Sequence, residues 1–157
     1  MSPHQPFQLS FVSGDSELPA PPASEILARV RDRPQWDEAS LTRGEDQFPR
    51  MHIARCEDYG FILHCFDDIE SWGDFLATDL TFSAPTIEIN LAGQALERWP
   101  LELFVSEQIA EDALSFFLKF GKRDPSQQWT KGDGFPREII WEGWEQREAW
   151  ESAHKGV

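Results

Sequence analysis

The chain has 157 residues, the length of one ordinary domain, and 40% of them are apolar, including seven tryptophans and twelve phenylalanines. Its 28 acidic and 14 basic residues give a formal net charge of −14 and a pI near 4.5. Such a surface repels nucleic acid and anionic lipid, so we expect no direct binding to nucleic acid or to a membrane. It attracts basic proteins, although solubility alone also accounts for an acidic composition.

The sequence shows neither the features of a signal peptide or membrane span nor a cysteine spacing typical of metal sites or disulfide frameworks. The first residues lack the basic start and apolar run of a signal peptide, and no stretch approaches the roughly 20 apolar residues of a membrane span. The sequence therefore predicts a cytoplasmic protein. Cys56 and Cys65 lack the spacing of a zinc site or a disulfide framework. A hairpin would bring them near one another, but reduced thiols are the expectation in the cytoplasm.

The N-terminal part of the chain has an extended pattern and then a helical one. Apolar residues alternate over 7–11, which predicts a short strand, and a proline-rich loop follows. The range 24–33 has helical periodicity and ends before Pro34, which cannot continue a helix. The apolar stripe of this helix comprises Ile26, Leu27 and Val30.

The centre of the chain predicts β-structure. Apolar and β-favouring residues over 50–56 and 61–66 flank a tight turn that contains Gly60, which indicates an antiparallel hairpin. The range 67–75 is then a loop that leaves the hairpin. Apolar and polar residues alternate over 86–91, which predicts a half-buried strand with one polar face.

The strongest single pattern is a helix over 106–120. Ser106 is a suitable N-cap, and Gly121 suits the position after the last turn. The expected apolar stripe comprises Ile109, Ala113, Phe116, Phe117 and Phe120. A short extended piece around Trp129 and an amphipathic helix within 131–157 complete the prediction. We therefore expect an α+β fold with a mostly antiparallel sheet packed against the 106–120 helix and one or two further helices.

The stretch HCFDDIESWGDF at 64–75 combines four carboxylates with a tryptophan. A metal site here would use His64, but no further ligands follow at a defined spacing. Paired carboxylates act as acid and base in hydrolases, but no nucleophile motif or phosphate-binding loop accompanies them. An aromatic anchor among acids suits a protein interface, whereas a buried tryptophan beside solvated acids would have no function. We expect no catalytic residue, no metal and no cofactor.

Several motifs recur in an order that resembles a known family. The 24–33 helix is followed by Phe48-Pro49, the hairpin over 50–66, and the 106–120 helix. Matching residues in and after that helix are Ala113, Phe116, Phe117, Gly121, Arg123, Pro125 and Trp129. In this order the chain resembles the first of the immunity-protein families of bacterial polymorphic toxin systems, whose members are often paired with deaminase or nuclease toxins. The pattern departs from the family at Ser106, where proline is frequent, and at Asp124, which separates Arg123 from Pro125.

The resemblance spans about 24–130 of a single domain over 1–157. The N-terminal strand and proline-rich loop (1–23) and an acidic, tryptophan-rich extension (131–157) lie outside it. It implies a cytoplasmic inhibitor that binds one cognate toxin, a basic domain acting on nucleic acid, and blocks its active site. The expected toxin-binding residues are Asp67, Asp68, Glu70, Trp72 and Asp74 in the loop, Glu88 on the strand, and Glu142, Glu145 and Glu148 in the extension. The alternatives are an acidic adaptor or regulatory binding module without a toxin, and a small hydrolase that uses the 64–74 cluster.

Overall fold

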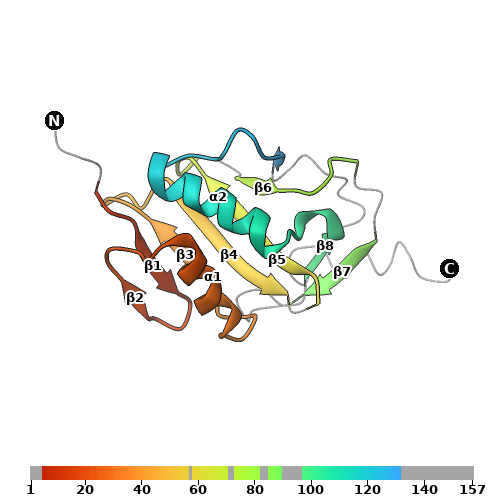
Figure 1. The fold of residues 1–157 in the computed structure, drawn as a ribbon, viewed down its shortest axis with the longest axis horizontal. Coiled ribbons are helices and arrows are strands. Elements are labelled where there is room, and N and C mark those ends of the chain that lie inside the picture. The colour runs from red at the N-terminus through yellow and green to blue at the C-terminus, as the bar shows by residue number, and fades with distance from the viewer. Residues whose placement is uncertain (1–4, 57, 71–72, 82–84, 90–96, 132–157) are drawn as a thin grey trace.

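The structure is a computed structural model that describes residues 5–56, 58–70, 73–81, 85–89 and 97–131 (Figure 1). In this part of the chain, seven antiparallel strands form the main sheet, in the order β2-β1-β3-β4-β5-β6-β9. These strands are β1 Gln8–Phe11, β2 Ser16–Glu17, β3 Ala39–Thr42, β4 Arg50–Cys56, β5 Gly60–Phe66, β6 Asp74–Leu76 and β9 Trp129–Lys131. A two-stranded sheet pairs β7 Thr86–Ile89 with β8 Glu97–Pro100. The helices are α1 Ala23–Arg31, the 3₁₀ turn η1 Leu101–Leu103 and α2 Glu107–Phe120. The expected α+β fold is confirmed.

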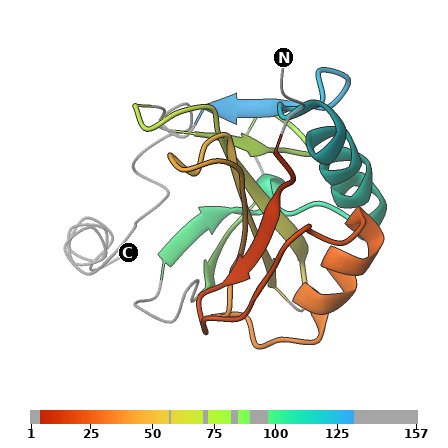
Figure 2. The same cartoon turned by 90° about the vertical axis from the view of Figure 1, so that its left-hand side faces the viewer.

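Both α-helices cover the same face of the main sheet (Figure 2). They bury its apolar side chains in one continuous core, which includes Leu9, Leu41, Met51, Leu63 and Phe117. A second, smaller cluster lies on the opposite face, where β8 and η1 pack against β4, β5 and β6. Its members are Ala54, Cys56, Ile62, Phe75, Ala77, Trp99, Leu103 and Phe104. The opposite face is therefore apolar at one end, where β8 covers it.

Most of the predicted elements are present, and the missed ones are short. The strand over 7–11, the hairpin, both helices and the extended piece at Trp129 are confirmed. The strands β2 and β6 begin in segments that were expected to be loop, and β3 lies in a segment for which no element was predicted. Each has only two to four residues, and β3 (ASLT) turns only Ala39 and Leu41 toward the core. So few apolar residues do not give a recognisable alternation.

The buried face of α2 differs from the predicted stripe. Ser106 caps the helix through a hydrogen bond from the Ile109 amide, and Gly121 follows it in the left-handed conformation, both as expected. The buried residues, however, are Ala110, Ala113, Leu114 and Phe117, whereas Phe120 is 51% exposed. Hydropathy ranks phenylalanine above alanine, but small side chains on the inner face let a helix approach its neighbours closely. The prediction was therefore wrong at Phe120.

The two cysteines lie far apart along the hairpin. Cys65 is opposite Met51, whereas Cys56 is opposite Gly60 at the other end, and each belongs to a different apolar cluster. Both are buried free thiols, so the hairpin does not bring them together. Burial, reinforced by the charge of Asp67, raises the pKa of the Cys65 thiol to about 12. This thiol is therefore unreactive in the folded protein.

Candidate protein-interaction site

The residues that follow β5 form an exposed acidic loop over 67–70. All four side chains, of Asp67, Asp68, Ile69 and Glu70, are exposed. Asp68 Oδ1 accepts a hydrogen bond from the Glu70 amide at 2.9 Å, which shapes the turn. Ile69 is 83% exposed, the largest value among the exposed large apolar side chains of the described residues. The acidic loop therefore presents an aliphatic side chain with carboxylates on both sides.

The predicted loop over 67–75 is shorter than expected, because Asp74 begins strand β6 opposite Cys65. The Asp74 carboxylate is only 18% exposed and forms an ion pair with Arg123. Arg123 also lies 3.5 Å from Asp67 Oδ2. The structure thus brings Asp67 and Asp74 together around one cation, which offsets part of their charge. Asp68 and Glu70 carry most of the remaining negative charge of the acidic loop.

The other predicted binding residues do not join this site. Glu88 is exposed on β7, which belongs to the two-stranded sheet and not to the sheet that bears the acidic loop. Trp72 lies outside the described residues, as do Glu142, Glu145 and Glu148. Of the nine predicted residues, Asp67, Asp68, Glu70 and Asp74 therefore make up the site that the structure describes.

Beside the acidic loop, five rings follow one another across the sheet face that is opposite the helices. We call them the ring row: His52, Phe66, His64, Phe75 and Trp99. His64 stacks on Phe75 with ring centroids 3.7 Å apart and also contacts Phe66 at 4.2 Å. His52 meets the Phe66 ring edge-on at 5.5 Å, and Phe75 lies 5.2 Å from Trp99. The row is buried at Trp99 and partly exposed at His52, whose side chain is 26% exposed.

Gly73 allows the rings to pack beside the acidic loop. It has a φ of 80°, and a Cβ there would overlap the side chains of His64 and Phe66. A residue with a side chain would therefore displace His64 and Phe66 from their places in the ring row.

The histidines of the ring row do not form a recognisable catalytic or metal-binding set. Within the described ranges, no three His, Cys, Asp or Glu side chains gather where they could hold a metal ion. His52 Nδ1 lies 3.3 Å from both Glu38 Oε1 and Ser40 Oγ. In a Ser-His-acid triad, the hydroxyl and the carboxylate contact different ring nitrogens. Here both contact the same nitrogen, so Ser40 is not placed as an activated nucleophile.

A hollow of about 150 Å³ lies between the acidic loop and the exposed end of the ring row. Its lining residues are Phe48, Arg50, His52, Phe66, Asp68 and Ile69. Arg50 Nη2 donates to Gln47 Oε1 at 2.7 Å, and the guanidinium lies 5.0 Å from the centre of the Phe48 ring. The sequence indicated the hairpin in which Arg50 is opposite Phe66, but not that the loop folds back beside them.

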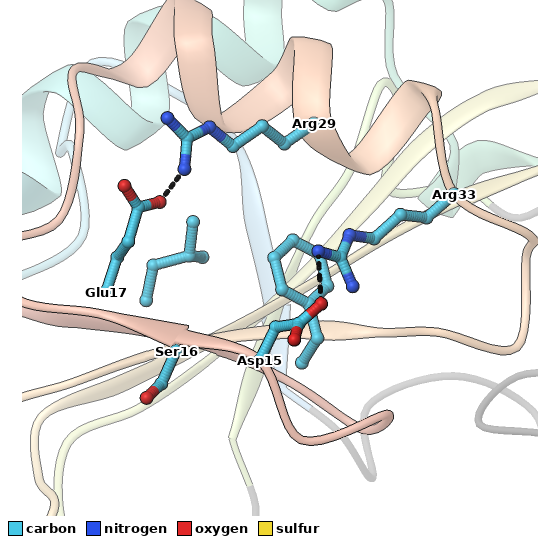
Figure 3. A pocket seen from close by; sticks show the side chains of 7 residues that line it. Asp15, Ser16, Glu17, Arg29 and Arg33 are labelled. Atoms are coloured by element: carbon cyan, nitrogen blue, oxygen red, sulfur yellow. Dashed lines mark hydrogen bonds and ion pairs between the residues drawn. The ribbon is translucent and has the colours of Figure 1, made fainter.

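A second hollow, of about 250 Å³, lies between the β1–β2 hairpin and α1 (Figure 3). Arg29 forms an ion pair with Glu17 across it, and Arg33 forms one with Asp15 at 2.9 Å. Every charged residue that lines this hollow is therefore paired with another one. We interpret these two ion pairs as structural contacts that hold the β1–β2 hairpin against α1.

No family model matches the chain, and no curated protein matches its sequence. Among the described residues, no helix is long and apolar enough to cross a membrane.

Proposed function

We propose that this protein is an immunity protein that binds a cognate basic toxin, one that acts on nucleic acid, and blocks its active site. The observation that carries the proposal is the acidic loop, where Ile69 is 83% exposed between carboxylates. Interfaces combine an apolar anchor with a charged rim, and here both lie in four consecutive residues. The resemblance noted in the sequence supports the same function.

Net charge supports the same kind of partner. A toxin that acts on nucleic acid needs a basic groove to hold phosphates, and a protein with a net charge of −14 complements such a groove. The complementary fields accelerate association at low ionic strength. Inhibition then requires only that the acidic loop and its surroundings cover the groove, with no chemistry on the side of the immunity protein.

The direct test is a titration against the toxin domain encoded by the neighbouring gene, by calorimetry at low and at high salt. We expect tight one-to-one binding that weakens as salt rises and that abolishes toxin activity in proportion. Neutralising the loop with Asp67→Asn, Asp68→Asn and Glu70→Gln should slow association about tenfold at low salt, because the local field that steers the encounter is removed.

A matched control separates the effect of the charges in the acidic loop from the effect of the total net charge. Asp32→Asn, Glu45→Gln and Asp58→Asn neutralise three other exposed acids and change the total charge equally. If the two triple variants slow association to the same extent, the acidic loop is not the contact surface. Binding that leaves toxin activity intact would favour an adaptor over an inhibitor.

A further inference from the structure

We propose, on the basis of this proposed function, that the hollow beside the acidic loop receives a tyrosine side chain of the toxin. Its lining combines apolar side chains with polar and charged ones. The apolar ones are Phe48, Phe66 and Ile69, and the others are the Arg50 guanidinium, the His52 imidazole and the Asp68 carboxylate. Each kind of group constrains what can occupy the space.

The hollow disfavours charged side chains of either sign, because a cation and carboxylates both lie at it. A lysine or arginine side chain would meet the Asp68 carboxylate but also the Arg50 guanidinium, whose like charge offsets that attraction. A carboxylate would pass Asp67, Asp68 and Glu70, in a protein whose net charge is −14. An uncharged ring avoids both penalties.

A phenol complements five of the six residues that line the hollow. Its ring packs against Phe48, Phe66 and Ile69, and its face is available to the Arg50 cation. Its hydroxyl can accept from the Arg50 guanidinium while it donates to the Asp68 carboxylate, because both residues line the hollow. A guanidinium only donates and a carboxylate only accepts, so neither matches both partners. Tyrosine is also enriched among the residues that dominate interface energetics.

The test uses the isolated full-length protein and four small probes, so it does not depend on the toxin. Nitrogen-15-labelled protein is titrated with p-cresol, 4-methylanisole, acetate and ethylguanidinium while amide shifts are followed by NMR. We expect saturable shifts at His52, Phe66 and Ile69 from p-cresol, with a dissociation constant on the order of millimolar. The anisole, which cannot donate a hydrogen bond, should bind several-fold more weakly, and the two ions should not saturate.

Two pairs of variants locate the probe. Arg50→Gln should weaken p-cresol binding about threefold, because it removes the cation that faces the ring. Arg55→Gln, on the same strand but on the helix side of the sheet, removes the same charge and should leave binding unchanged. Ile69→Ala should weaken binding about twofold. Leu80→Ala, which removes an apolar side chain that is 51% exposed elsewhere, should not.

The outcomes are separable. The absence of saturable p-cresol shifts, or tighter binding of acetate or ethylguanidinium, overturns the assignment of a tyrosine. Equal effects of Arg50→Gln and Arg55→Gln also overturn it, because the probe then does not sit in the hollow. Toxin binding without p-cresol binding would leave the immunity function standing and remove only this inference.

Discussion

Asp37 is a buried acid that joins three segments of the chain. It is 5% exposed, accepts from Arg33 Nη1 at 2.8 Å, and accepts from both the amide and the hydroxyl of Ser13. Arg33 in turn lies 3.7 Å from the centre of the Phe11 ring. The carboxylate thus links the β1–β2 turn, the end of α1 and the segment that leads into β3.

The first prediction concerns the pH dependence of this link. Burial raises the pKa of Asp37, but hydrogen bonds from Arg33 and Ser13 outweigh it, so the folded-state pKa lies below the ordinary value. The stability it contributes is therefore complete above the unfolded pKa of about 4 and is lost as pH falls through the lower folded value. Asp37→Asn should reduce the free energy of unfolding by about 2 kcal/mol at neutral pH. Urea unfolding should show this difference shrinking below about pH 4.

Asp15→Asn is the control for that experiment. Asp15 also pairs with Arg33, but its side chain is 74% exposed. Exposed ion pairs contribute little, so the change should stay within about 0.5 kcal/mol. A loss as large as that of Asp37→Asn would show that burial is not what makes the Asp37 link strong.

At the scale of elements, helix α2 provides the second prediction. Phe117 is fully buried, with its ring 4.7 Å from that of Phe7, whereas Phe120 is 51% exposed three residues later. Phe117→Ala should destabilise the protein by about 4 kcal/mol, and Phe120→Ala by less than about 1 kcal/mol. Denaturant unfolding of the two variants and of the unchanged protein measures both losses. Similar losses for the two variants would instead favour the apolar stripe predicted from the sequence.

The third prediction concerns how β5 is joined to the segment before α2. Phe61 and Val105 exchange two backbone hydrogen bonds, of 2.9 and 2.8 Å. Gly60, with a φ of 114°, lies so close to the Val105 carbonyl that a Cβ would overlap it. Gly60→Ala should therefore cost about 3 kcal/mol, from backbone strain and the displaced bridge together.

Gly14→Ala isolates the backbone part of that cost. Gly14 has a φ of 111°, nearly the same, but a Cβ there would meet nothing within 4 Å. We expect a loss of about 1 kcal/mol, measured by the same urea midpoints. If Gly14→Ala is as costly as Gly60→Ala, the approach of Val105 contributes nothing.

At the scale of the whole molecule, the fold class could be predicted from the sequence because the long elements have clear hydrophobic periods. Two helices and a hairpin of two seven-residue strands each contain enough apolar residues to define a period, and together they determine the α+β class. The short strands β2, β3 and β6 are extended because neighbouring strands pair with them. That pairing is not encoded within so few residues.

The site was predictable to a similar degree. The acidic residues of the loop, and the prediction that they form a protein interface, followed from the local composition of 64–75. The ring row and the hollow depend on the cross-strand partners His52, His64, Arg50 and Phe66. Their proximity to Asp68 depends on how the chain leaves β5, and Ile69 becomes prominent only when its exposure is known. Sequence patterns report which residues share a strand face, but not where a loop comes to rest.

The last prediction concerns the net charge of −14, which acts on the folded state before any partner binds. Self-repulsion disfavours a compact chain, and salt screens it as the Debye length falls from about 30 Å at about 0.01 M to about 8 Å at about 0.15 M. At pH 7 we therefore expect the urea midpoint to rise between these two salt concentrations. Near pH 4.5, where the net charge vanishes, salt acts chiefly on local ion pairs such as Arg29–Glu17 and Arg31–Glu107, so the rise should disappear or reverse. A midpoint that falls with salt at pH 7 would mean that these local pairs outweigh the global repulsion.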